Sequence, residues 1–311
     1  MSYTVQIISK KKKDELMSKL YSSTLYERKA IIHGTCVKFF TDNHDFKDMW
    51  EDNFDLVPDW LRPHARLFAV EGSEFRVLYE PLSKTVILTG CDYYGWVKSI
   101  ALGLVADFFE DFTSEHRRYS VHGSFVDSGG RGIGIIGPSG SGKTTLTYGL
   151  LMDKKCNFVT DDWFFVRLAE NDTIIHSAEK NSYIRGDLEN SWAEYAGRLK
   201  GIKKDKQDRA IVDVKQFFGS DRIRSHSVLT TTVLLTRNKS LPPLSKLSEK
   251  QAIDFMLKND FCNPHQLVRN REKLNQRKQF FSELFTRAPV YLLNTIETPQ
   301  QSLERIKNLL L

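Results

Sequence analysis

The chain has 311 residues, of which 41% are hydrophobic and 27% are charged, and 45 Lys+Arg against 39 Asp+Glu give a net charge of +6. These proportions exclude disordered, collagen-like and low-complexity proteins. The longest apolar stretch, residues 99–109, contains Asp107 and is far shorter than the ~20 residues of a membrane span. We expect a globular protein of about two domains without a membrane partner. No apolar signal segment precedes Lys10–Lys13, so we expect a cytoplasmic location.

The remaining composition gives little sign of metal or nucleic-acid binding. The four cysteines, at 36, 91, 156 and 262, are too scattered for a zinc site, and we predict free thiols. The run Lys10–Lys13 is typical of a solvated helix start, and the basic residues in 269–278 are typical of a helix surface. A nucleic-acid partner is therefore not expected.

The N-terminal part alternates apolar and turn residues in a way that predicts strands. These strands are expected at Val37–Phe40, Arg66–Val70, Phe75–Tyr79 and Thr85–Thr89. A helical apolar period follows from Gly95 to about Glu115. We therefore predict a small α/β domain at 1–115, whose role the sequence does not assign.

The C-terminal part, 116–311, begins with a predicted hairpin and continues as a second α/β domain. Its expected strands are 121–126, 133–136, 157–159, 163–166, 228–235 and 290–293. Its expected helices are 145–152, 249–258, 264–285 and 299–310. The glycine-rich turn 128–130 joins the first two strands.

A phosphate-binding loop is the most informative motif. The segment GPSGSGKT at 137–144 matches the Walker A pattern GxxxxGK[ST] between a predicted strand and a predicted helix. Its glycines permit positive φ, and the helix start adds partial positive charge. We expect Lys143 to reach the β- and γ-phosphates of ATP and Thr144 to hold Mg²⁺. The expected nucleotide-binding residues are Gly137, Pro138, Ser139, Gly140, Ser141, Gly142, Lys143, Thr144 and Thr145.

An overlapping match to GxGxxG, at Gly132, Gly134 and Gly137, points to a different ligand. The first two glycines fall inside the predicted strand, whereas a dinucleotide site needs them in the strand-to-helix turn. A dinucleotide-binding site is therefore not expected at these glycines.

Paired aspartates follow the next predicted strand. A P-loop site needs a carboxylate at the end of a nearby strand for Mg²⁺, and Asp161-Asp162 has the required apolar approach. Neighbouring residues on a strand point to opposite faces. One aspartate can thus face the metal and the γ-phosphate while a neighbouring group fixes the other. An aspartate that instead meets an acceptor hydroxyl can take its proton.

At this point the sequence resembles the HPr kinase/phosphorylase family, whose fold is related to ATP-dependent phosphoenolpyruvate carboxykinase. The resemblance rests on His122-Gly123 before the P-loop, the P-loop itself and VTDD at 159–162, and it covers mainly 120–235. It implies a P-loop kinase core of the HPr kinase and carboxykinase type, with ATP and Mg²⁺ as cofactors. It also implies that Asp161 is the base, that Asp162 supports the metal and that His122 lies near the transferring phosphate.

The chain departs from the family pattern in one informative place. Bacterial members carry Glu-Ile-Arg-Gly after the aspartates, whereas this chain has Tyr183-Ile184-Arg185-Gly186. Asp187 or Glu189 is a candidate to replace the glutamate. Arg185 and Arg209, the latter ahead of DVKQFFG at 213–219, are candidate phosphate or substrate contacts.

Three functions follow, in order of preference. The first is a Mg²⁺-dependent ATP kinase that phosphorylates a hydroxyl of a protein, a peptide or a small molecule. The second is an ATP-binding regulatory switch without a phosphate acceptor, and the third is a carboxykinase-like enzyme acting on a small organic acid. Relatives of this group are often oligomers, so a homo-oligomer is one expectation.

Overall fold

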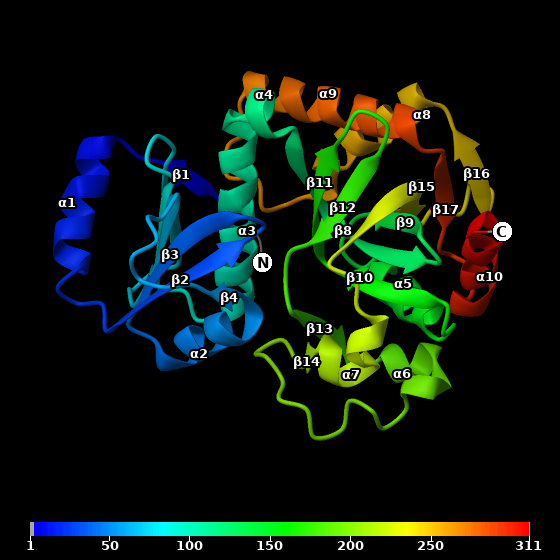
Figure 1. Ribbon diagram of the computed structural model, residues 1–311, viewed down its shortest axis with the longest axis horizontal. Helices are drawn as coiled ribbons and strands as arrows, with labels where there is room; N and C mark the ends of the chain where they lie inside the picture. The colour runs from blue at the N-terminus through cyan, green and yellow to red at the C-terminus, as the bar shows by residue number, and fades with distance from the viewer. Residues whose placement is uncertain (1–2, 311) are drawn as a thin grey trace. The chain divides into compact units, whose positions relative to one another are not determined.

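The computed structural model describes residues 3–310 and divides the chain into two compact units. The first unit comprises Met1–Phe112 and Pro264–Arg269, and the second comprises Thr113–Asn263 and Asn270–Leu311. Both units mix helices and strands, so the predicted α/β class is confirmed (Figure 1). Within residues 3–310, no helix has the length and apolar character needed to cross a membrane.

The first unit is built on a seven-stranded sheet in the order β1-β6-β7-β5-β3-β2-β4. Its strands are β1 (Val5–Ile7), β2 (Tyr26–Ile32), β3 (Thr35–Thr41), β4 (Asp55–Leu56), β5 (Ala65–Val70), β6 (Arg76–Glu80) and β7 (Thr85–Thr89). Its helices are α1 (Lys10–Leu20), α2 (His44–Asn53) and α3 (Tyr94–Asp111). The four predicted strands correspond to β3, β5, β6 and β7.

Helices pack on both faces of this sheet, as the alternation of side chains along β3 dictates. Phe40 stacks on Phe68 and joins the apolar side chains of α1 on one face. The next residue back, Phe39, points to the other face and stacks on Trp50 of α2, with ring centroids 4.5 Å apart. The two-sided burial explains why β3 is apolar almost throughout.

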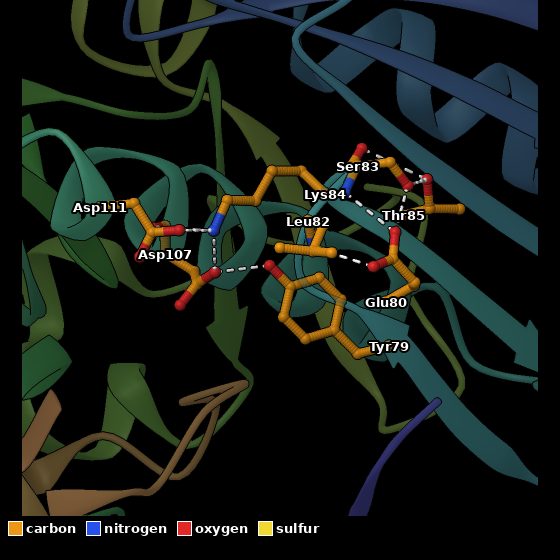
Figure 2. Close-up of polar contacts among 8 residues, drawn as sticks. All are labelled: Tyr79, Glu80, Leu82, Ser83, Lys84, Thr85, Asp107 and Asp111. Carbon is orange, nitrogen blue, oxygen red and sulfur yellow. Dashed lines mark hydrogen bonds and ion pairs between the residues drawn. The ribbon is translucent and has the colours of Figure 1, made fainter. Parts of the chain in front are cut away.

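A polar cluster ties the β6–β7 turn to α3 (Figure 2). Lys84 forms ion pairs with Asp107, at 2.5 Å, and with Asp111. The hydroxyl of Tyr79 donates to the same Asp107 oxygen, Oδ2, at 2.5 Å. Burial, followed by the charge of Asp107, raises the pKa of Tyr79 far above its ordinary value, so the phenol remains a donor. The charge of Lys84 is therefore balanced by one buried and one exposed carboxylate of the same unit.

The second unit contains an eight-stranded sheet and a separate two-stranded sheet. Its strands are β8 (Arg118–Ser128), β9 (Arg131–Ile136), β10 (Cys156–Thr160), β11 (Trp163–Leu168), β12 (Thr173–Ser177), β13 (Asn181–Arg185), β14 (Arg209–Asp213), β15 (His226–Thr236), β16 (Leu244–Leu247) and β17 (Val290–Asn294). The main path runs β10-β8-β11-β12-β15-β17-β16, and β9 pairs with both β8 and β15. The small sheet is β13-β14.

Helices cover this sheet through two apolar clusters. The helical segments are α4 (Thr113–His116), α5 (Lys143–Leu151), α6 (Leu188–Ser191), α7 (Val214–Phe218), α8 (Glu249–Lys258), α9 (Arg271–Arg287) and α10 (Pro299–Leu310), with short 3-10 turns η1 (Ala193–Tyr195), η2 (Ser220–Arg222) and η3 (Asp260–Cys262). One cluster joins α5 and α10 to β9, β15 and β17. The other joins α8 and α9 to β8, β11 and β15. The P-loop helix α5 is thus fixed from several directions.

The predicted helix at 264–285 is wrong in its first third. Helix α9 begins at Arg271, where the Asn270 side chain accepts a hydrogen bond from the backbone of Lys273 at 2.8 Å. Residues 264–269 belong to the first unit, in which His265 stacks on Tyr3 and Leu267 is buried. These contacts between distant parts of the chain outweigh the local helical pattern.

Candidate active site

The segment that matches the Walker A pattern, residues 137–144, lies between β9 and α5, as the motif predicts. Gly140 and Gly142 have φ of +75° and +103°, a region in which side chains other than glycine are strained. Gly137 is needed for space instead, because a Cβ atom there would lie 2.6 Å from Ser141 Oγ and 2.8 Å from Leu235 Cβ. Gly132 lies inside β9, where a Cβ atom would meet the Phe125 ring. The backbone angles and close contacts of this loop therefore agree with the Walker A pattern, and Gly132 of the GxGxxG match is required by strand packing.

Lys143 opens helix α5 and is buried. Its ammonium group donates to two carbonyls of its own loop, those of Gly137 at 2.7 Å and Pro138 at 3.2 Å. Burial lowers the pKa of Lys143, while the negative charges of Asp162 and Asp161 oppose that shift. The lysine is thus held along the loop with neutral partners.

Asp161 and Asp162 form the link between β10 and β11, and both of these strands pair with β8. The backbone N–H of Gly123 on β8 donates to the Asp162 carbonyl at 3.0 Å. A Cβ atom on Gly123 would lie 2.8 Å from the Ile135 carbonyl, so this position needs glycine. The pairing explains why the His-Gly dipeptide and the aspartates lie together despite their separation in sequence.

His122 is held between a carbonyl and a carboxylate. Its Nδ1 atom lies 2.7 Å from the carbonyl oxygen of Cys262, which can only accept a hydrogen bond, so Nδ1 carries a proton. Its Nε2 atom lies 3.3 Å from Asp162 Oδ1. Cys262 ends a turn in which Asp260, Phe261 and Cys262 all have positive φ, an uncommon run for residues other than glycine. The structure thus brings His122 beside Asp162.

Asp161 is buried and is held by a chain of hydroxyl groups. Ser182 on β13 donates to Asp161 Oδ2 at 2.5 Å, and the hydroxyl of Tyr148 on α5 donates to Ser182 Oγ at 2.8 Å. Ser182 and Tyr148 are both fully buried. The two aspartates therefore have different surroundings, since Asp161 is buried and Asp162 is half-buried.

The strands β13 and β14 supply another wall, where Arg185 pairs in register with Arg209. Arg185 is exposed, whereas Arg209 is bound to Asp205 at 2.8 Å and lies over the Tyr183 ring. Hydrogen bonds from Arg209 overcome the effect of burial and lower the pKa of Asp205. Arg209 is thus already committed to an ion pair.

One pocket of about 380 Å³ gathers most of the predicted residues. It is lined by His122, Ser139, Gly140, Gly142, Lys143, Thr144, Thr145, Asp161, Asp162, Tyr183, Ile184, Arg185, Asp187, Leu188, Arg209 and Arg237. Gly137, Pro138 and Ser141 support the loop instead of lining this pocket, and Glu189 accepts from the Gly197 backbone. Of the two acids considered in place of the family glutamate, Asp187 is the one at the pocket.

Sequence reasoning missed several residues of this site. Arg237 follows β15, lines the pocket and contacts Thr295, whose hydroxyl donates to the Ser141 carbonyl of the loop at 2.8 Å. Ser182, Tyr148 and the Cys262 carbonyl were also missed. These groups carry no motif, and only strand pairing and packing bring them to the aspartates and His122.

Comparison with known proteins gives sequence relatives for part of the chain. No family model matches. The HPr kinase/phosphorylase of Chlorobium luteolum is 32% identical over 142 residues, 45% of this chain and 37% of the relative. The protein of the same name from Lachnoclostridium phytofermentans is 30% identical over 149 residues, 47% of this chain and 41% of the relative. The chain therefore spans about two fifths of the length of these relatives.

A solved structure, "Structure of the Hpr(Ser) kinase/phosphatase from Coxiella burnetii", aligns with 61% of this chain and 96% of its own, at 18% identity and a TM-score of 0.35. The glycine loop, the lysine that opens α5 and the carboxylates after β10 lie in an α/β fold, and this arrangement is consistent with the P-loop kinase type. The sequence relatives are named HPr kinase/phosphorylase, and they support an HPr kinase-like family for the chain.

Proposed function

We propose that the chain is a Mg²⁺-dependent ATP kinase that transfers the γ-phosphate to a hydroxyl group. The observation that carries the proposal is the convergence of Lys143, Asp161, Asp162 and His122 on one pocket beside the P-loop. The names of the sequence relatives state HPr, a protein, as their substrate. A hydroxyl on a protein is therefore the first acceptor to test, before a peptide or a small molecule.

The residues fit a bound Mg²⁺ ion, because the hydroxyl of Thr144 and two carboxylates line one pocket and Mg²⁺ prefers oxygen ligands. We assign Thr144 and Asp162 to the metal and Asp161 to the base, as the family resemblance implies. When bound, the ion would neutralise charge on the phosphate oxygens. Asp187, which stands near the place of the missing family glutamate, is a further oxygen donor at this pocket.

Transfer then depends on positioning by the chain's own groups. The backbone N–H groups of the loop and Lys143 would hold the β- and γ-phosphates. Asp161 would take the proton of the acceptor hydroxyl as its oxygen bonds to the γ-phosphorus. The bond from that phosphorus to the β–γ bridging oxygen breaks, and ADP leaves. Arg185, exposed at the pocket, is available to a phosphate or an acceptor.

The test is incubation with Mg²⁺ and γ-labelled ATP, with and without extract of the source cells, followed by separation of labelled macromolecules and small molecules. Asp161→Asn is expected to retain ATP binding while losing transfer. Asp127→Asn is the matched control, because Asp127 is also a buried carboxylate that accepts from a serine, Ser227, at 2.5 Å, but it does not line the pocket.

Three outcomes decide the proposal. A labelled product that disappears in Asp161→Asn and persists in Asp127→Asn supports a kinase and identifies its acceptor class. Wild-type transfer by Asp161→Asn would refute the base assignment. ATP binding with slow phosphate release and no labelled acceptor would instead favour the regulatory switch.

A further inference from the structure

The hydroxyl chain behind Asp161 has a fixed direction. An ionised carboxylate only accepts hydrogen bonds, so the Ser182 hydrogen must point to Asp161 Oδ2. A hydroxyl has one hydrogen, and Ser182 Oγ must therefore accept from Tyr148, whose hydroxyl lies 2.8 Å away. Burial raises the pKa of Tyr148 well above its ordinary value, which keeps the phenol protonated as a donor.

The row of hydroxyl groups, Tyr148 and Ser182, reaches Asp161 from the core. Asp161 lines the pocket, whereas Ser182 and Tyr148 are fully buried and are not among the residues that line it. Neither hydroxyl is therefore placed to touch a nucleotide or an acceptor. Both can act only through the carboxylate that they hold.

The contact between the Tyr148 and Ser182 hydroxyl groups also fixes two walls of the pocket relative to each other. Tyr148 lies on α5, the helix that Lys143 opens, and Ser182 lies on β13 directly before Tyr183, Ile184 and Arg185, which line the pocket. Trp192, farther along from β13, also donates to the Thr145 carbonyl on α5, at 2.7 Å. The orientation of Asp161 is thus coupled to the helix that carries the phosphate-binding lysine.

We propose that Ser182, supported by Tyr148, is a positioning residue that orients the Asp161 carboxylate for phosphoryl transfer. The inference rests on the proposed kinase function. It assigns a role to two residues outside the P-loop and the aspartate pair. Hydrogen-bonding partners behind a reacting or metal-binding group commonly change activity 10–100-fold when removed.

The chain contains a matched control for this inference. Ser227 donates to Asp127 at 2.5 Å in the same unit, so Ser182 and Ser227 make the same kind of buried contact. Only the Ser182 contact ends on a carboxylate that lines the pocket. A purely structural role predicts similar effects of Ser182→Ala and Ser227→Ala.

The experiment measures kcat and KM for ATP in Ser182→Ala, Tyr148→Phe and Ser227→Ala, with the unfolding midpoint of each variant. We expect Ser182→Ala to lower kcat about 10–100-fold while KM for ATP changes less than about threefold. Tyr148→Phe leaves the Ser182 contact in place and should lower kcat less. Ser227→Ala should shift the unfolding midpoint and leave kcat per folded molecule unchanged.

A double variant tests whether Ser182 acts through Asp161. If it does, Asp161→Asn/Ser182→Ala has the same residual activity as Asp161→Asn alone, whereas independent residues give multiplied losses. Because Ser182→Ala could also weaken folding, Tyr148→Phe and the unfolding midpoints separate lost folding from lost positioning.

The experiments distinguish a failure of the proposed kinase function from a failure of the positioning role of Ser182. A wild-type protein that transfers no phosphate to any acceptor refutes the proposed function, and the positioning role falls with it. A wild-type kinase whose kcat is lowered equally by Ser182→Ala and Ser227→Ala, or by neither, leaves the function standing and overturns the positioning role alone.

Discussion

Each unit contains a buried lysine close to two aspartates, and the two lysines are used differently. In the first unit, Lys84 makes ion pairs with Asp107 and Asp111, so carboxylates of the same unit balance its charge (Figure 2). In the second unit, Lys143 donates to two uncharged carbonyls and lines a pocket with Asp161 and Asp162. A buried ionic group that the fold neutralises is structural. One held by neutral partners at a pocket fits the charged ligand that we propose for this unit.

The surroundings of the aspartates show the same contrast. Asp107 is shared by Lys84 and Tyr79 inside the first unit. Asp161 is held by a neutral serine, which fixes the carboxylate and leaves its charge uncancelled by that contact. The distinction predicts which replacements change stability and which change activity.

Replacing Lys143 should give the largest functional loss. Lys143→Ala removes the charge assigned to the β- and γ-phosphates, and we expect ATP affinity to fall about 100-fold or more. Titration of Mg·ATP against the wild type and the variant measures the loss. Unfolding curves are the control, since a variant that has lost its fold would lose affinity for another reason. Wild-type ATP affinity in a folded Lys143→Ala protein would contradict the assignment of Lys143 to ligand binding and of Lys84 to structure.

Replacing Lys84 should have the opposite profile. Lys84→Met leaves Asp107 buried without its cation, so the free energy of unfolding should fall by about 3–5 kcal/mol. ATP affinity of the folded fraction should not change. Urea unfolding and ATP titration on the same sample measure both quantities.

Lys84→Met/Asp107→Leu supplies the control for this prediction. Removing both charges avoids the uncompensated carboxylate, so part of the lost stability should return. If Lys84→Met instead keeps its stability and loses ATP binding, the cluster around Lys84 takes part in function, and its assignment as purely structural is wrong.

The sequence predicted those parts of the fold and the site that depend on local pattern. Strands β3, β5, β6 and β7 follow apolar runs, and the P-loop follows a motif in which each residue has a local role. The aspartates were predicted from their place at the end of a strand near the P-loop, and His122 through the family pattern. Strand pairing with β8 explains why they meet.

The rest depends on contacts between distant segments. Ser182 on β13 meets Asp161 and Tyr148 only after folding, and the sequence around it contains no motif. Residues 264–269 look helical, yet His265 packs on Tyr3, 262 positions away. Local pattern could not reveal either contact.

A smaller effect is expected from His176 on β12. Burial first, then the nearby charges of His226, Arg118 and Arg167, lower the pKa of His176 to about 4. The unfolded chain takes up this proton near pH 6.5, so protonation favours unfolding and stability falls as pH drops from 6.5 towards 4. Because the ring is partly exposed, we expect a loss of about 1–2 kcal/mol.

His176→Gln should flatten that part of the stability profile. Urea unfolding at several pH values between 4 and 7 measures it, and His44→Gln is the control because His44 is exposed in the first unit. An unchanged acid slope in His176→Gln would place the acid sensitivity elsewhere.

The smallest effect concerns thiol reactivity and requires no mutation. Burial raises the pKa of Cys262 to about 12 against the opposing charge of Lys143, and burial also raises the pKa of Cys36 and Cys156. The thiolate is the reactive form, so at pH 8 iodoacetamide should label half-buried Cys91 first and the three buried thiols at least about tenfold more slowly. Mass spectrometry of the intact and digested protein follows each site, and labelling in urea shows that all four can react.

Labelling of native Cys262 as fast as Cys91 would mean that the Asp260–Cys262 turn opens readily. His122 would then lose the carbonyl partner that holds it beside Asp162, and the second unit would lack the rigid pocket on which the contrast with the first unit depends.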